Sequence, residues 1–147
     1  MKKITLVLGL MFAVGISSVF ANENKVSAIV LESFRKEFSN AKDVSWVEGI
    51  DYYRAAFSFN GQNMFAIFSM KGELLSMDRY ISPLQLPIRL FSDLKNNHSA
   101  YWITDLFEVN NSEGTHYYVT LENADKVVRL SANNGKDWKT INTKRKS

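Results

Sequence analysis

Residues 52–75 read YYRAAFSFNGQNMFAIFSMKGELL and form the densest run of strand-forming residues in the chain. Two turn signals, Asn60-Gly61 and Lys71-Gly72, interrupt this run. Such pairs between apolar segments are typical of two-residue hairpin loops, so the stretch is predicted to be an antiparallel β-meander. The meander holds no nucleophile, metal-ligand cluster or phosphate-binding glycine loop. The sequence alone therefore does not establish a biochemical activity.

A two-residue loop also predicts which residues lie opposite each other across a hairpin. The first loop pairs Phe59 with Gln62 and Tyr53 with Phe68, and the second pairs Phe68 with Leu75. One face of the meander is then apolar nearly throughout, and we expect a helix to cover it. This face carries Tyr53, Ala55, Phe57, Phe59, Met64, Ala66, Phe68, Leu75 and Met77.

The opposite face of the meander is mixed but too aromatic for an ordinary solvent-facing surface. It carries Tyr52, Arg54, Ala56, Ser58, Asn63, Phe65, Ile67, Leu74, Ser76, Asp78 and Tyr80. Tyr, Phe and Arg are enriched at protein interfaces. The candidate partner-binding residues are Tyr52, Arg54, Phe65, Ile67 and Tyr80. The alternative is that this face packs on the other half of the molecule or on the side chains of a neighbouring strand.

The chain begins as secretory signal peptides do. Lys2 and Lys3 form a basic start, residues 4–16 are apolar, and small residues precede Ala21. This order predicts a signal peptide over residues 1–21 with cleavage after Ala21. Glycine and serine make the run a poor membrane span, which needs about 20 strongly apolar residues. We expect a periplasmic or secreted protein with no stable membrane anchor once the signal peptide is removed.

The mature chain that this cleavage predicts is nearly neutral. Removing Lys2 and Lys3 from the 18 Lys and Arg residues leaves 16, against 15 Asp and Glu. The chain has no cysteine, which excludes disulfides and an acylated anchor. Without a basic stripe we expect no nucleic-acid binding. Residues 144–147 are interpreted as an exposed basic tail.

Beyond the meander, periodicity predicts two helices and five more strands. Residues 24–38 are predicted as an amphipathic helix capped by Asn22 or Asn24, and Pro87 is predicted to start a second helix that ends near Asn96. Further strands are expected at residues 44–47, 102–109, 115–122, 126–132 and 138–143. The register of the last strands stays open: either Val128, Leu130 and Ile141 face the core, or Val127 and Trp138 do.

The two halves of the chain follow one predicted plan. Tyr53 in the first half corresponds to Tyr117 in the second at an offset of 64 residues, and Gly72 corresponds to Gly135 at an offset of 63. A near-constant offset is what a tandem repeat predicts. The predicted fold is α+β, a tandem duplication of one helix plus a four-stranded antiparallel meander. The predicted division is a signal peptide at 1–21, repeats at 22–82 and 83–143, and a tail at 144–147.

These features resemble the PepSY-like proteins that are described as similar to β-lactamase inhibitor proteins. The resemblance rests on Val44-Ser45-Trp46, on residues 53–59, on Lys71-Gly72-Glu73-Leu74-Leu75 and on Leu86-Pro87. It implies that both helices lie on one face of the sheet and that the other face is open. It also implies an exported, non-catalytic binding or inhibitory role. The inhibitors are stapled by disulfides, which a chain without cysteine cannot form.

Catalytic and metal chemistry have little support in the sequence. His98 and His116 are the only histidines, and neither lies near clustered acidic residues. No Gly-x-Ser-x-Gly elbow is present. We expect no enzyme, no metal and no cofactor. The leading hypothesis is a module that binds another protein through the open face and is inhibitor-like. The alternatives are a carrier of small apolar ligands or envelope lipids, and an envelope protein that forms homodimers.

Overall fold

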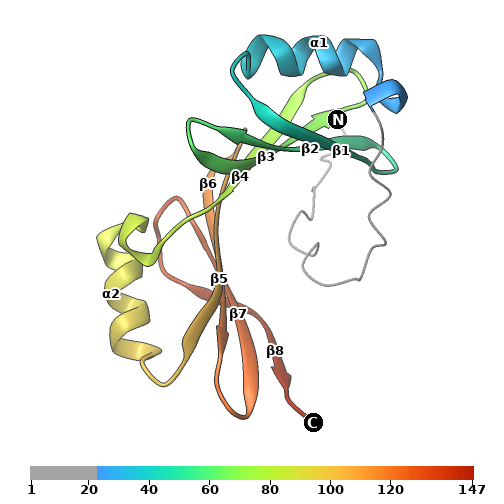
Figure 1. Ribbon diagram of the computed structural model, residues 1–147. Helices are drawn as coiled ribbons and strands as arrows, with labels where there is room; N and C mark the ends of the chain where they lie inside the picture. Colours follow the sequence, from blue (N-terminus) through green and yellow to red (C-terminus); the bar gives the residue numbers. More distant parts are fainter. Residues whose placement is uncertain (1–22) are drawn as a thin grey trace, which may run out of the picture.

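The computed structural model describes residues 23–147 and shows eight antiparallel strands, each paired with its neighbours in sequence (Figure 1). The predicted signal peptide and Asn22 lie outside the described residues. Two helices, α1 (Ala28–Glu37) and α2 (Ile88–Asn97), accompany the sheet. The strands are β1 (Lys42–Glu48), β2 (Tyr52–Phe59), β3 (Gln62–Ser69), β4 (Leu74–Tyr80), β5 (Trp102–Asn111), β6 (Gly114–Glu122), β7 (Lys126–Asn133) and β8 (Lys139–Arg145).

The expectation of two four-stranded meanders is wrong, because all eight strands belong to one sheet. Strand β4 pairs with β5, with Ser76 opposite Asn111 and Tyr80 opposite Phe107. The pairing continues past β4, where the Ile81 N–H donates to the Leu106 carbonyl over 3.1 Å. Separate meanders would leave the backbone groups of two more edge strands unpaired, and joining them satisfies those groups. The chain is α+β, with a continuous sheet in place of a duplicated four-stranded one.

The register predicted for the first hairpin is confirmed in full, from Phe59 opposite Gln62 to Tyr53 opposite Phe68. The second hairpin differs at one position. Phe68 lies opposite Leu74 and not Leu75, because the register shifts by one residue between Ile67 and Phe68. A bulge of this kind inserts an extra residue that the turn signal alone does not reveal.

The N-terminal cap predicted for the first helix is wrong. Helix α1 begins at Ala28 with Ser27 at the N-cap, because residues Glu23–Lys25 form a separate 3-10 turn. Val26, between the turn and the helix, is buried in the core. The second helix is close to its prediction, with Pro87 at the N-cap and the helix ending at Asn97.

Helix α1 covers the first hydrophobic core, which is rich in aromatic side chains. Phe34 lies at its centre, with its ring 5.1 Å from Trp46, 5.0 Å from Phe57 and 5.3 Å from Phe38. The contacts with Trp46 and Phe57 are edge-to-face, a geometry that stabilises beyond the area that it buries. The core contains Val26, Val30, Phe34, Phe38, Trp46, Tyr53, Ala55, Phe57, Ala66 and Phe68.

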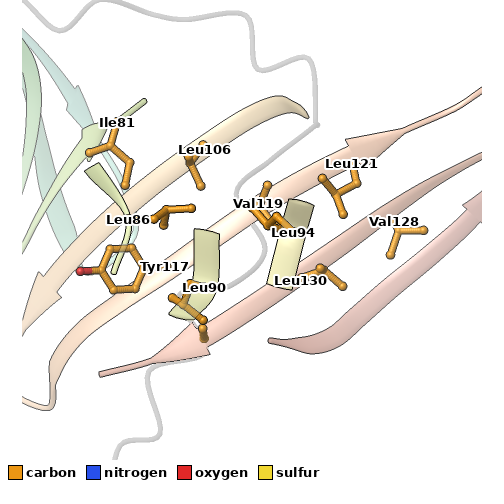
Figure 2. Packing of buried hydrophobic residues seen from close by; sticks show 11 residues of the cluster. Ile81, Leu86, Leu90, Leu94, Leu106, Tyr117, Val119, Leu121, Val128 and Leu130 are labelled. Carbon is orange, nitrogen blue, oxygen red and sulfur yellow. The ribbon is translucent and has the colours of Figure 1, made fainter. Parts of the chain in front are cut away.

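Helix α2 covers a second core made mostly of leucine and valine (Figure 2). Neither of the two predicted arrangements of the last strands holds whole: Val128 and Leu130 are buried in this core, while Ile141 is 47% exposed. The register between β7 and β8 shifts between Arg129 and Leu130, which separates Ile141 from the two core residues. Trp138 packs against the same core, and its indole N–H donates to the Leu90 carbonyl over 3.0 Å. The core contains Ile81, Leu86, Leu90, Leu94, Leu106, Tyr117, Val119, Leu121, Val128, Leu130 and Ala132.

Both helices lie on the same face of the sheet. Met77, which packs on the first core, precedes Arg79 by two residues on β4 and so shares its face. Arg79 lies opposite Glu108, and Glu108 lies opposite Tyr117 of the second core. The Arg79 guanidinium binds the Glu108 carboxylate over 2.9 Å between the two cores. We call the opposite face, which neither α1 nor α2 covers, the open face.

Candidate functional site

The open face carries a row of aromatic side chains across its middle strands. Phe65 on β3, Tyr80 on β4 and Phe107 on β5 are neighbours, with ring centroids 6.0 Å apart between the first two and 4.0 Å apart between the last two. The Arg54 guanidinium lies over the Phe65 ring, 4.0 Å from its centroid. The row forms because residues on one face of neighbouring strands stand side by side.

The structure brings three of the five predicted binding residues together. Arg54, Phe65 and Tyr80 form part of the aromatic row, and the Tyr80 side chain is 53% exposed. Ile67 lies on the same face but is only 6% exposed. Tyr52 lies apart at the start of β2, where its ring covers Gly49. The role of these residues in binding stays a prediction.

Sequence reasoning missed the part of the row that lies on β5 and β6. Phe107 lies opposite Tyr80 on one side and opposite Tyr118 on the other. The alternation within residues 102–111 already indicates that Phe107 belongs to one face. Its neighbour Tyr80 follows only from the β4–β5 pairing, which no turn signal predicts.

Carboxylate and phenol groups surround the row. The Ser76 hydroxyl donates to the Asp78 carboxylate over 3.1 Å. Burial raises the pKa of Asp78, and the Ser76 hydrogen bond and the Arg54 charge oppose that rise. Burial also raises the pKa of Tyr118, helped by the negative charge of Asp78. Tyr80 has a pKa raised by burial and by the Asp105 charge. The phenols therefore stay neutral hydrogen-bonding groups at physiological pH.

His116 lies on the open face beside the β5–β6 turn and is held from both sides. Its Nδ1 lies 3.0 Å from Oδ1 of Asn133, and its Nε2 lies 3.2 Å from Oδ1 of Asn111. These contacts tie three strands together. Within residues 23–147, no group of three or more His, Cys, Asp or Glu side chains is placed to hold a metal ion.

A shallow depression adjoins the aromatic row on the side of β8. The residues that line it are Phe107, Tyr118, Val119, Thr120, Arg129, Leu130 and Ile141. Its walls combine two aromatic rings, an aliphatic side chain and a guanidinium. The depression is too small to hold a side chain, so it adds a largely apolar hollow to the open face and no binding pocket.

Solved structures with the same fold show what this chain is similar to. A BLIP-like protein from Bacteroides fragilis aligns with a TM-score of 0.67 and 20% identity, covering 81% of this chain and 85% of its own. A DUF2874 family protein from Bacteroides uniformis gives 0.71 and 15%, over 81% and 88%. A protein from Bacteroides eggerthii, provisionally described as periplasmic, gives 0.70 and 14%, over 82% and 88%.

These likenesses show the fold, at identities too low to carry a function. No protein-family model and no curated protein matches the chain. The BLIP-like part of the predicted resemblance therefore holds for the fold, and the PepSY-like part stays a prediction. In the described residues, no helix is long and apolar enough to cross a membrane.

Proposed function

We propose that this chain is an exported, non-catalytic binding protein that holds another protein against its open face. The observation that carries the proposal is the row of Arg54, Phe65, Tyr80 and Phe107. Arg54, Phe65 and Tyr80 are accessible to a partner, while the Phe107 ring is only 5% exposed and supports Tyr80 from within the sheet. Aromatic and arginine side chains are the residue types that dominate binding energy in protein interfaces. A sheet holds them in place before the partner arrives, which lowers the entropy cost of binding.

The predicted signal peptide supports a periplasmic or secreted location, and a fold neighbour is itself provisionally described as periplasmic. The mechanism we propose is occlusion, in which the rigid face covers the partner's surface. An enzyme restrained in this way is one such partner, and this would be an inhibitor-like role. The chain's own part requires no proton transfer and no cofactor.

Site-specific photo-crosslinking in the native cell envelope tests this proposal. A photoreactive phenylalanine analogue is placed at Tyr80 and, in a separate variant, at Leu84, which is 83% exposed in the turn before α2. We expect an adduct with another protein from position 80 and none from the control position. Arg54→Ala should remove that adduct, because Arg54 completes the row.

The same experiment separates the competing functions. An adduct of twice the chain's own mass would replace the proposal with self-association through the open face. Equal adducts from positions 80 and 84 would contradict a specific site. A small molecule that native mass spectrometry finds bound to the wild type and lost from Tyr80→Ala would favour the ligand carrier.

A further inference from the structure

The start of β5, the β6–β7 turn and the end of β8 form the end of the sheet farthest from α1 (Figure 1). The residues of this end include several aromatic and basic ones. Trp102 at the start of β5 is 54% exposed, and Ile103 beside it is 36% exposed. Tyr101, just before β5, packs partly against the second core. A tryptophan this exposed is unusual, because its large apolar ring is normally removed from water.

Two lysines lie over these rings. The Lys146 ammonium is 5.6 Å from the centroid of the Trp102 ring, and the Lys126 ammonium is 5.7 Å from that of the Tyr101 ring. Lys146 also forms an ion pair with Glu122, and its backbone N–H donates to the Asp125 carbonyl over 2.8 Å. These contacts mean that the predicted basic tail is held against the sheet and is not a free end.

Strand register adds two further cations to the same end. Lys126 lies opposite Arg145, and Val127 lies opposite Lys144, so both partners belong to β8. All residues of β8 are exposed. We call the set of Tyr101, Trp102, Lys126, Lys144, Arg145 and Lys146 the basic–aromatic end. Glu122 and Asp125 are the acidic residues on the strands and turn beside it, and Lys146 pairs with Glu122.

This concentration of positive charge matters because residues 22–147 carry a net charge of only +1 in total. Four cations against two acids give the basic–aromatic end a net charge of +2, which leaves the rest of residues 22–147 at −1. The rest of the described surface is close to balance, so this end is where a negatively charged surface would be attracted.

We propose that the basic–aromatic end docks reversibly on an anionic phospholipid surface. Trp and Tyr rings favour the boundary between headgroups and acyl chains, and nearby lysines attract the phosphate groups of anionic lipids. Lysine stems lie along apolar surface while their ammonium groups stay in water. A protein partner fits less well, because lysine is depleted in protein interfaces and three of the four cations here are lysines. Docking of this kind leaves the aromatic row of the open face, with Tyr80, free for the partner proposed above.

Vesicle binding tests the proposal with the processed protein purified from the cell envelope. Co-sedimentation is measured with vesicles of phosphatidylcholine alone and of phosphatidylcholine with phosphatidylglycerol, at low and high salt. We expect binding only to the anionic vesicles, weakened by salt because exposed charges are screened. Lys144→Gln and Arg145→Gln should each reduce affinity about fivefold, since each removes one cation near the surface.

Trp102→Ala tests the contribution of the aromatic ring. Lys36→Gln combined with Lys71→Gln is the control for the cation variants, since both lysines are exposed in the half of the chain covered by α1. We expect Trp102→Ala to weaken binding and the control to leave it unchanged, while all variants keep the wild-type melting temperature. Three results would overturn the proposal: equal binding to both vesicle types, equal losses in the control, or no vesicle binding while soluble polyglutamate binds.

Discussion

The two faces of the sheet differ in what covers their side chains. The most deeply buried large side chains all belong to the two helix-covered cores: Trp46, Phe68, Leu90, Leu121, Leu130, Val30 and Val119. The open face also contains buried residues, such as Phe107 and His116, but it mixes them with Asp78 and the half-exposed Tyr80. Apolar burial is therefore concentrated on the covered face, and partly exposed polar and aromatic side chains are concentrated on the open face.

This difference indicates that the covered face stabilises the fold and that the open face is available for binding. Burial of apolar area dominates folding free energy, at roughly 25 cal/mol per Å². The covered face supplies most of that burial, so its residues should be sensitive to truncation. Residues of the open face can be selected for contacts with a partner, because changing them should cost the fold little.

The largest expected effect is that of Phe34→Ala. Phe34 is 5% exposed and touches four other aromatic rings of the first core, on Phe38, Trp46, Phe57 and Phe68. Removing the ring leaves a cavity, and we expect the free energy of unfolding to fall by about 3–5 kcal/mol. Urea denaturation measures this value. Lys36→Ala on the same helix is the control, and a loss below about 1 kcal/mol for Phe34→Ala would contradict its central place.

A slightly smaller effect is expected for Leu90→Ala in the second core. Leu90 is fully buried, and its carbonyl accepts the Trp138 indole hydrogen bond. We expect a loss of about 2–5 kcal/mol, with Ile88→Ala as the matched control because Ile88 is 78% exposed on the same helix.

The pairing of β4 with β5 adds a second expectation for both core variants. Each should unfold in one transition, since the continuous sheet couples the two cores. Two separate transitions in circular dichroism would contradict this coupling.

Much of the covered face could be predicted from the sequence, because local signals determine it. The Asn60-Gly61 turn set the pairing of β2 with β3, and the alternation on those strands then identified Tyr53, Phe57 and Phe68 as core residues. The pairing of β4 with β5 could not be predicted. Twenty-one residues separate these strands, and their contact depends on where α2 and the connector return the chain.

The candidate site was predicted only in part, because local turn signals determine the register within the first four strands but not the contact between β4 and β5. Arg54, Phe65 and Tyr80 were placed on one face by turn-set register. Phe107 and Tyr118 were missed because they join that face only through the long-range β4–β5 contact. Tyr52 was grouped with the others only because side chains alternate between the two faces of a strand. The structure places its ring over Gly49 in the preceding turn.

On the open face, Tyr80→Ala should cost much less stability than either core variant. The Tyr80 ring is half-exposed and stacks on Phe107, and an aromatic pair contributes about 0.5–1.5 kcal/mol. We expect a loss within that range, measured by urea denaturation beside Phe34→Ala. A loss as large as that of Phe34→Ala would show that the open face also stabilises the fold, and would remove the contrast between the two faces.

The smallest expected effect is a gain in stability from Asp78→Asn. Burial raises the pKa of Asp78 above its ordinary value of 3.8. Between 3.8 and that raised pKa, the folded protein binds more protons than the unfolded chain, so stability falls as the pH rises. At neutral pH the charged carboxylate carries the full penalty. Asparagine removes the charge and keeps an oxygen that can accept the Ser76 hydrogen bond.

We therefore expect Asp78→Asn to be more stable than the wild type at pH 7, with the difference shrinking as the pH falls toward 3.8. Chemical denaturation at pH 7, 5 and 4 measures it. Asp51→Asn in the exposed β1–β2 turn is the matched substitution measured beside it. If Asp78→Asn were less stable at pH 7, the attraction of Arg54 for the carboxylate would outweigh burial. Asp78 would then stabilise the open face as the core residues stabilise the covered one.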